Sequence, residues 1–184
     1  MIKYAAFFAL SLASAAAAET LDDCRRHKHF GRMTEAKACY TLLTRANTAY
    51  LRAEGFWGIG NFKTANEQFK AAVAANKADP NVRVRWGRLF LDNDQPGDAA
   101  ELFQEALKIK DKYPPALVGL AMVASATFED KAAEMAKEAA SGDPKLVEAR
   151  ELLARLALED TNPEKAVEEA DKALEIAPDA LDAM

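Results

Sequence analysis

The residues of this chain with the strongest potential for metal chemistry lie together near one end, at Cys24, His27 and His29. Thiolate and imidazole groups are preferred zinc ligands, and a structural zinc site needs four of them. The C-x2-H-x-H spacing supplies only three, and two histidines two positions apart point to different sides of a helix. We therefore expect solvent-facing histidines on a helix, and the sequence predicts neither a metal site nor a cofactor.

No arrangement typical of an enzyme appears elsewhere in the sequence. It has no His-Glu-x-x-His, no Gly-x-Ser-x-Gly and no glycine-rich phosphate loop, and its two histidines lie near the same end. Acidic pairs such as Asp22-Asp23 and Glu168-Glu169 are typical of solvated helix faces. The formal net charge is −5, whereas a nucleic-acid binder needs clustered Lys and Arg. The sequence predicts a non-catalytic protein that does not bind nucleic acid.

The first eighteen residues have the three-part layout of a secretory signal peptide. Lys3 gives a positive start, residues 4–15 are apolar and uncharged, and residues 16–18 are the alanines that a signal peptidase reads. The apolar run is shorter than the roughly 20 residues of a membrane-spanning helix. We expect cleavage after Ala18, and a soluble mature chain without a membrane span that is periplasmic or secreted.

An oxidising compartment favours pairing of the only two cysteines, Cys24 and Cys39. Cys24 is expected on the first helix of a hairpin and Cys39 on the second, with the turn near Gly31. In an antiparallel pair these positions are nearly opposite one another. The sequence therefore predicts a disulfide, and the alternative is two small thiols buried in the hairpin.

A small-residue signature, Ala-x3-Phe/Ala-x2-Ala, recurs four times along the chain. The copies begin at Ala65, Ala99, Ala132 and Ala166, so the steps between them are 34, 33 and 34 residues. A period of about 34 residues with two helical runs per unit indicates stacked helical hairpins. No β-type alternation appears. The predicted fold is all-α, a right-handed α-solenoid of antiparallel helix pairs.

The motif residues resemble those of the tetratricopeptide repeat (TPR) family, which places large, small and aromatic residues and a proline at set offsets. The unit from Pro80 matches most fully, with Trp86-Gly87, Phe90, Ala99, Phe103 and Ala106. A weaker unit at residues 20–44 departs from the pattern, because the step from Ala36 to Ala65 is only 29 residues. The resemblance implies an exported bacterial TPR protein.

The expected organisation is a signal peptide at 1–18 and a TPR-like solenoid at 19–184. Asp79-Pro80, Asp143-Pro144 and Asn162-Pro163 each predict a helix start, because the side chain caps an orphan N–H group and proline fits the first helical position. Without a polar capping helix, the last pair is expected to fray or associate through its exposed face. The helix pairs are expected at about 20–45, 46–77, 80–111, 114–141 and 144–176, with the start of a further helix at 179–184.

The TPR resemblance implies that the first helix of each pair lines a concave face. Residues one turn apart there, away from the alanines, are expected to form a partner-binding groove. Trp57 is the expected anchor, and the alternative is that it packs against the short first hairpin. The predicted groove residues combine aromatic, apolar and charged side chains: Tyr50, Glu54, Trp57, Val84, Arg88, Leu91, Val118, Met122, Glu151 and Arg155.

Two functions follow from these observations. The first is an exported, non-catalytic scaffold that binds a protein or peptide through its concave face. The second is the recognition arm of a larger envelope enzyme, peptidase-like or otherwise, whose catalytic domain follows Met184. A chaperone adaptor is disfavoured, because the Lys and Asn of the family's carboxylate clamp are missing from the matching positions. The repeat names neither the partner nor the oligomeric state.

Overall fold

The computed structural model describes residues 20–126 and 131–179, and these residues form ten α-helices and no strand. The expected signal peptide at 1–18, and all but the first residue of the helix expected at 179–184, lie outside the described residues. No helix in the described part combines the length and hydropathy needed to cross a membrane. The helices are α1 (Leu21–His29), α2 (Met33–Leu43), α3 (Ala49–Gly58), α4 (Phe62–Ala75), α5 (Pro80–Leu91), α6 (Pro96–Ile109), α7 (Pro114–Ala126), α8 (Ala132–Gly142), α9 (Val147–Glu159) and α10 (Pro163–Ile176).

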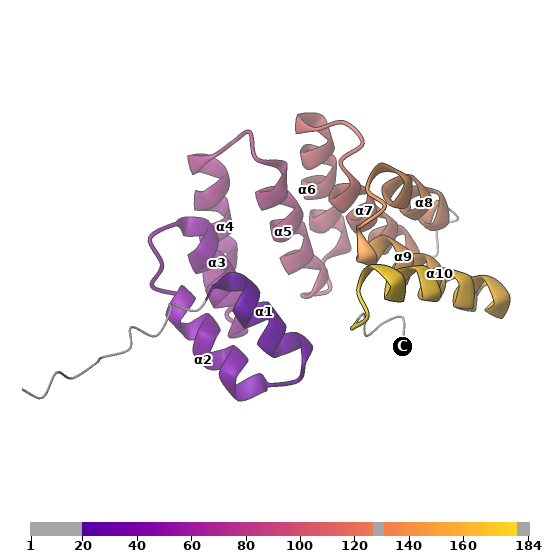
Figure 1. The fold of residues 1–184 in the computed structure, drawn as a ribbon. Helices are drawn as coiled ribbons and strands as arrows, with labels where there is room; N and C mark the ends of the chain where they lie inside the picture. The colour runs from indigo at the N-terminus through magenta and orange to yellow at the C-terminus, as the bar shows by residue number, and fades with distance from the viewer. Residues whose placement is uncertain (1–19, 127–130, 180–184) are drawn as a thin grey trace, which may run out of the picture.

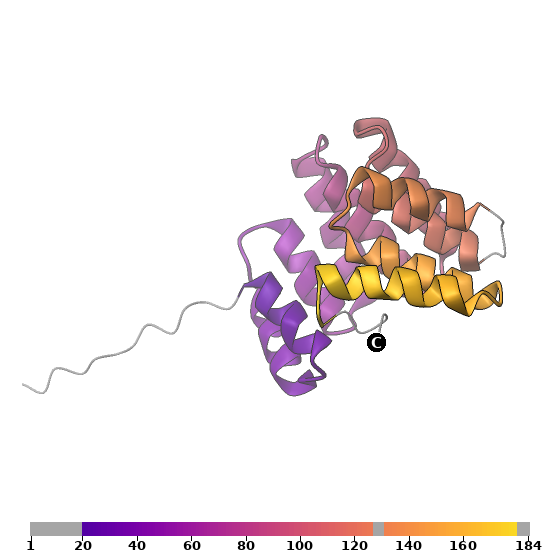
Figure 2. The same cartoon turned by 45° about the vertical axis from the view of Figure 1, so that its right-hand side comes forward.

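The helices form a curved stack of antiparallel pairs, which confirms the predicted all-α solenoid (Figure 1). Each helix contacts the next, and the first helices of neighbouring pairs also touch, as α5 with α7 and α7 with α9. The curvature brings the two ends of the stack together (Figure 2). His29 Nε2 at the end of α1 lies 2.8 Å from the carbonyl oxygen of Asp179, which follows α10.

Polar side chains fix several helix starts. The carboxylate of Asp79 accepts the Asn81 N–H at 2.8 Å before α5, and Asn162 accepts the Lys165 N–H at 3.1 Å before α10. The predicted starts at Asp79-Pro80 and Asn162-Pro163 are therefore confirmed. The start predicted at Asp143-Pro144 is wrong, because the Asp143 carboxylate accepts the Lys145 N–H in a turn and α9 begins only at Val147.

The recurring small residues lie where the helices cross, and the aromatic residues fill the space beside them. Ala65 and Ala99 are fully buried, as are Phe69 and Phe103 one turn later. The Phe103 ring packs directly on the backbones of α5 and α7. A Cβ atom added to Gly119 would lie 2.4 Å from Phe103 Cε1, and one added to Gly87 would lie 2.7 Å from the same atom. These two glycines let three helices meet at one ring.

Replacement of Gly119 tests this close approach. We expect Gly119→Ala to lower the free energy of unfolding by about 1–3 kcal/mol, because the new methyl group must displace a fully buried ring. Gly97→Ala in α6 is the matched control, since nothing lies within 4 Å of its added Cβ. The control should be neutral or stabilising by up to about 1 kcal/mol. Urea denaturation of both variants measures the difference, and equal effects would contradict the packing described.

The first pair is joined by the predicted disulfide between Cys24 of α1 and Cys39 of α2, both buried. The sulfur of Cys24 is bonded to that of Cys39 and is therefore unavailable as a thiolate ligand. No group of metal-binding side chains occurs among the described residues. Tyr40 then docks this pair on α3, because a Cβ atom added to Gly58 would lie 2.1 Å from the Tyr40 ring. The disulfide thus holds together the pair that closes the N-terminal end of the stack.

Removal of the disulfide tests its role in stability. The bond closes a loop with a sequence separation of 15 residues, which corresponds to about 3 kcal/mol of stabilisation in the chain-entropy model. We expect Cys24→Ser/Cys39→Ser to lose roughly that much in chemical denaturation. Thiol titration of the unreduced, denatured protein should find no free thiol in residues 20–184. Two reactive thiols, or unchanged stability of the double variant, would contradict this role.

Candidate protein-binding surface

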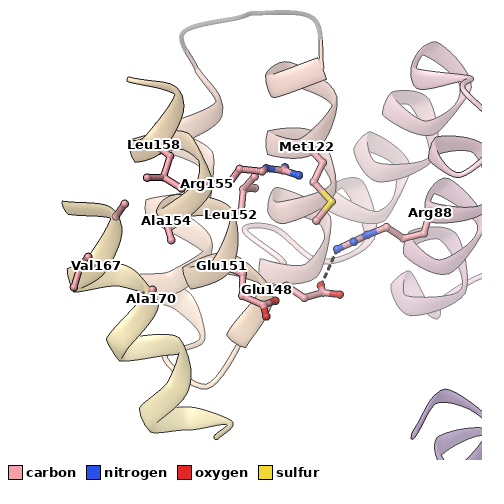
Figure 3. A pocket seen from close by; sticks show the side chains of 11 residues that line it. Arg88, Met122, Glu148, Glu151, Leu152, Ala154, Arg155, Leu158, Val167 and Ala170 are labelled. Atoms are coloured by element: carbon pink, nitrogen blue, oxygen red, sulfur yellow. Dashed lines mark hydrogen bonds and ion pairs between the residues drawn. The ribbon is translucent and has the colours of Figure 1, made fainter. Parts of the chain in front are cut away.

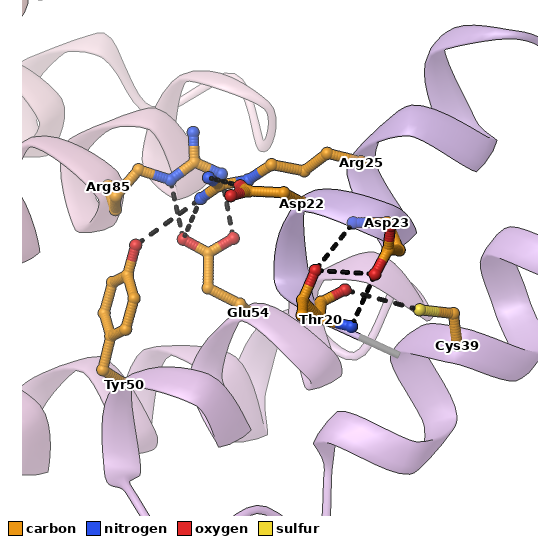
Figure 4. Close-up of polar contacts among 8 residues, drawn as sticks. All are labelled: Thr20, Asp22, Asp23, Arg25, Cys39, Tyr50, Glu54 and Arg85. Carbon is orange, nitrogen blue, oxygen red and sulfur yellow. Dashed lines mark hydrogen bonds and ion pairs between the residues drawn. The ribbon is translucent and has the colours of Figure 1, made fainter. Parts of the chain in front are cut away.

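A buried carboxylate lies at the N-terminal end of the concave surface. Helix α3 places Glu54 at 2% relative exposure, and its carboxylate accepts hydrogen bonds from two arginines (Figure 4). Arg85 of α5 donates through Nε at 2.7 Å and through Nη2 at 2.9 Å, and Arg25 of α1 donates through Nη2 at 3.2 Å. One carboxylate therefore joins the first helices of three successive pairs.

The surroundings of Glu54 fix the charge of its neighbours. Burial raises the pKa of the Tyr50 hydroxyl, and the nearby charge of Glu54 raises it further, so Tyr50 remains neutral. Burial disfavours the charged form of Arg85, but its hydrogen bonds to Glu54 and the charge of Glu54 outweigh that effect and raise its pKa. The result is a fixed pattern of charges at neutral pH.

Trp57 packs against the cluster formed by Glu54, Arg25, Arg85 and Tyr50, called here the Glu54 cluster. The Arg85 guanidinium lies 4.5 Å from the centroid of the Trp57 ring, within the range of a cation–π contact. The Trp57 indole N–H donates to Asp92 Oδ2 at 3.0 Å, and its ring meets Phe69 edge-on with centroids 6.2 Å apart. Trp57 is therefore a half-buried residue that packs on α4 and α5.

A pocket of about 620 Å3 opens between α5, α7, α9 and α10 (Figure 3). An ion pair spans it, because Arg88 Nη2 of α5 donates to Glu148 Oε2 of α9 at 2.8 Å. Arg88 is mostly buried, whereas Glu148 and Arg155 are about half exposed. The lining consists of Arg88, Met122, Glu148, Glu151, Leu152, Ala154, Arg155, Leu158, Ala166, Val167 and Ala170.

Four of the ten predicted groove residues, namely Arg88, Met122, Glu151 and Arg155, line this pocket. Three others lie at the N-terminal end instead: Tyr50 and Glu54 belong to the Glu54 cluster, and Trp57 packs against it. The prediction that Glu54 lines an accessible groove is wrong, because its carboxylate is buried between two arginines.

Val84 and Val118 are also incorrectly predicted as groove residues. They are 4% and 0% exposed, because Val84 belongs to a core cluster with residues of α6 and α7, and Val118 to one with residues of α8 and α9. Leu91 is half-buried and packs against the core around Phe103. The concave surface is therefore narrower than counting along the repeat suggests.

Sequence reasoning missed the contributions of Arg25, Arg85 and Glu148, and all those of α10. The small residues Ala166 and Ala170 were identified only as part of the repeat signature, yet they form one wall of the pocket. The available signal in the sequence was that Ala166 and Ala170 belong to the last copy of the repeat signature. The pocket as a whole offers charged donors and acceptors beside apolar side chains, a composition suited to noncovalent recognition.

Stacked helix pairs with a charged concave surface define the protein as an α-solenoid. Residues 50–115 match the family model described as tetratricopeptide repeat, and the chain has the fold of a tetratricopeptide-repeat solenoid. The solved structure of TTC0263, a thermophilic TPR protein of Thermus thermophilus, is similar with a TM-score of 0.71 and 22% identity over 89% of this chain and 92% of that one.

Two further solved structures share the fold. YrrB, described as a TPR protein with an unusual peptide-binding site, has a TM-score of 0.53 and 22% identity over 89% of this chain and 87% of its own. MamA from Desulfovibrio magneticus RS-1 has a TM-score of 0.58 and 16% identity over 87% of this chain and 94% of its own. At these identities the likeness establishes the fold alone.

Substitution of Glu54 tests the buried cluster. We expect Glu54→Gln to lower the free energy of unfolding by about 3–5 kcal/mol, because it leaves two guanidinium groups without their shared counter-charge. The matched control is Glu105→Gln, which breaks the 3.0 Å pair with Arg83 at a carboxylate that is 51% exposed. That change should cost at most about 1 kcal/mol. Thermal and urea unfolding measure both, and an equally small loss for the two variants would contradict a structural role for Glu54.

Proposed function

We propose that this protein is a non-catalytic scaffold that binds a segment of another protein on its concave surface. The observation that carries the proposal is the pocket of about 620 Å3 between α5, α7, α9 and α10. This volume falls within the range of roughly 300–1,000 Å3 that is usual for ligand sites. Its charged groups provide directional contacts and its apolar groups provide contact area, and both lie on rigid helices.

Two contrasting sets of contacts support an assignment of binding to this pocket rather than to the Glu54 cluster. Around Glu54, the charges satisfy one another and lie between packed helices. In the pocket, Arg155 is 54% exposed and lies 4.0 Å from Glu159, a distance at the limit of an ion pair. Arg155 therefore remains accessible to a carboxylate of a partner. Arginine is enriched among residues that dominate interface energies.

We further propose that the scaffold is residues 19–184 and works outside the cytoplasm, in the periplasm or as a secreted protein. The leader-like residues 1–18 and the Cys24–Cys39 disulfide support this location, because disulfides persist in oxidising compartments. The peptide-binding site named for YrrB is consistent with a polypeptide as the partner.

Site-specific photocrosslinking in the native host tests the proposed function. We expect a crosslinker in place of Met122, which lines the pocket, to form an adduct with a polypeptide. The matched control position is Leu42 on α2, which is 62% exposed and lies outside the pocket. Introducing Arg155→Glu should reduce the Met122 adduct at least about tenfold, because it reverses a charge in the interface. Circular dichroism should show unchanged helicity in every variant.

Equal adducts from Met122 and Leu42, or a Met122 adduct that is insensitive to Arg155→Glu, would contradict a concave-surface site.

A further inference from the structure

We infer that the turn between α1 and α2 docks this protein on an anionic lipid surface. The basic tip is defined by five residues at the end of α1, in the turn and at the start of α2: Arg26, Lys28, Phe30, Arg32 and Met33. None of them lines the pocket of the proposed function, so the inference is independent of that proposal. The tip lies at the lower edge of the stack in both views (Figure 1, Figure 2).

The basic tip concentrates positive charge in a chain whose formal net charge is −5. Residues 26–32 hold three Lys or Arg side chains, two histidines and no acidic residue. Arg26 pairs with Asp23 one turn earlier on α1. Lys28 and Arg32 are exposed, and neither forms an ion pair with another residue of the part that the structure describes. An anionic surface would supply the opposite charge for both.

Two large apolar side chains are exposed beside these cations. Phe30 is 49% exposed and Met33 is 60% exposed. Gly31, with φ of 68°, reverses the chain between them, a backbone conformation that glycine adopts readily. The Arg32 guanidinium carbon lies 5.6 Å from the centroid of the Phe30 ring, so the cation and the ring form one surface. Apolar side chains flanked by cations are typical of interfacial membrane contacts.

Helix stability explains only part of this composition. The basic side chains in the last turn of α1 oppose the negative end of its helix dipole. Arg32 has no such role, because it precedes the first turn of α2, where a positive charge is unfavourable. Its side chain also makes no capping hydrogen bond there. Arg32 and the exposed Phe30 therefore fit a ligand outside the chain better than they fit the needs of folding.

The equivalent turns of other helix pairs have the opposite character. These turns are residues 59–61 between α3 and α4, 92–95 between α5 and α6, and 160–162 between α9 and α10. None of the three carries Lys or Arg, and the last two carry aspartate. Because the pairs are antiparallel and stacked in sequence, the turns follow one edge of the stack. A basic tip at the end of an acidic edge would orient the protein with α1 and α2 toward an anionic surface.

A lipid surface fits the shape of the tip better than an acidic polypeptide does. The tip is a projecting turn, and a bound polypeptide segment needs a groove or an edge to lie along. Headgroup phosphates can meet exposed cations without such a groove, and each Lys or Arg near an anionic membrane strengthens binding by about fivefold. Three cations and one aromatic ring predict attachment that is reversible and that salt weakens.

Paramagnetic broadening of methionine methyl NMR signals tests this inference. The full chain with isotope-labelled methionine methyl groups is mixed with vesicles that contain a spin-labelled lipid. One set of vesicles is phosphatidylcholine, and the other is an equimolar mixture of phosphatidylcholine and phosphatidylglycerol. Met33 reports the tip, whereas Met122 in the pocket and Met135 on α8 are references within the same molecule.

We expect the Met33 signal to lose at least about half of its intensity with the anionic vesicles and to be unchanged with the neutral ones, while Met122 and Met135 keep theirs. Lys28→Glu/Arg32→Glu should reduce the Met33 broadening at least about threefold. The matched control is Lys70→Glu/Lys77→Glu, which changes the total charge equally at two exposed lysines away from the tip and should leave the broadening unchanged. Circular dichroism should show the same helicity in all three proteins.

An unbroadened Met33 signal, equal broadening with both kinds of vesicle, or equal responses of the two double variants would overturn the inference. If Met33 ignores vesicles but shifts on addition of polyglutamate, the tip binds an acidic polypeptide and the inference is likewise wrong. Neither result bears on the pocket, because crosslinking at Met122 tests the proposed function separately.

Discussion

A hairpin of two amphipathic helices cannot bury its apolar surface alone, and every other feature of this protein depends on that constraint. Each pair is covered by the next, and the alanines at the crossings allow the helices to approach closely. Phe103 illustrates the consequence: its fully buried ring fills a space whose walls are the glycine backbones of α5 and α7. Close contact at such points fixes the angle between pairs and hence the curvature of the stack.

Curvature in turn decides which side chains meet. Arg88 and Glu148 are 60 residues apart in sequence, yet they form a 2.8 Å ion pair across the concave surface. Glu54 likewise gathers arginines from the pairs before and after its own. His29 and Asp179 bring the two ends of the stack into contact. The Arg88–Glu148 pair leaves a pocket beside it, whereas Glu54 and its two arginines fill the space between their helices with paired charges.

The sequence was sufficient to predict the fold class because the repeat signature directly reports helix crossings. It also indicated the Cys24–Cys39 pair, since a hairpin with its turn near Gly31 brings those positions together. It was insufficient for the concave surface. Counting along the repeat places Val84 and Val118 on the groove surface. In the structure Val84 is buried in a core cluster with residues of α6 and α7, and Val118 in one with residues of α8 and α9.

Glu54 and α10 show the same limit of sequence reasoning. A glutamate on an amphipathic helix is usually solvated, and its burial here depends on Arg25 and Arg85, which come from other pairs. The contribution of Ala166, Val167 and Ala170 to the pocket depends on the position of α10 relative to α9 and on the curvature of the stack. Such long-range placement results from many small packing contacts, which no local spacing encodes.

The central claim is that the pocket between α5, α7, α9 and α10 receives a polypeptide segment. The most direct measurement is an NMR titration of the protein with the partner segment crosslinked at Met122, synthesised on its own. We expect saturable shifts of the Met122 and Leu152 methyl signals, with the signals of Leu42 unmoved. Binding that shifts Leu42 or other residues outside the pocket while Met122 and Leu152 remain unchanged would contradict the claim.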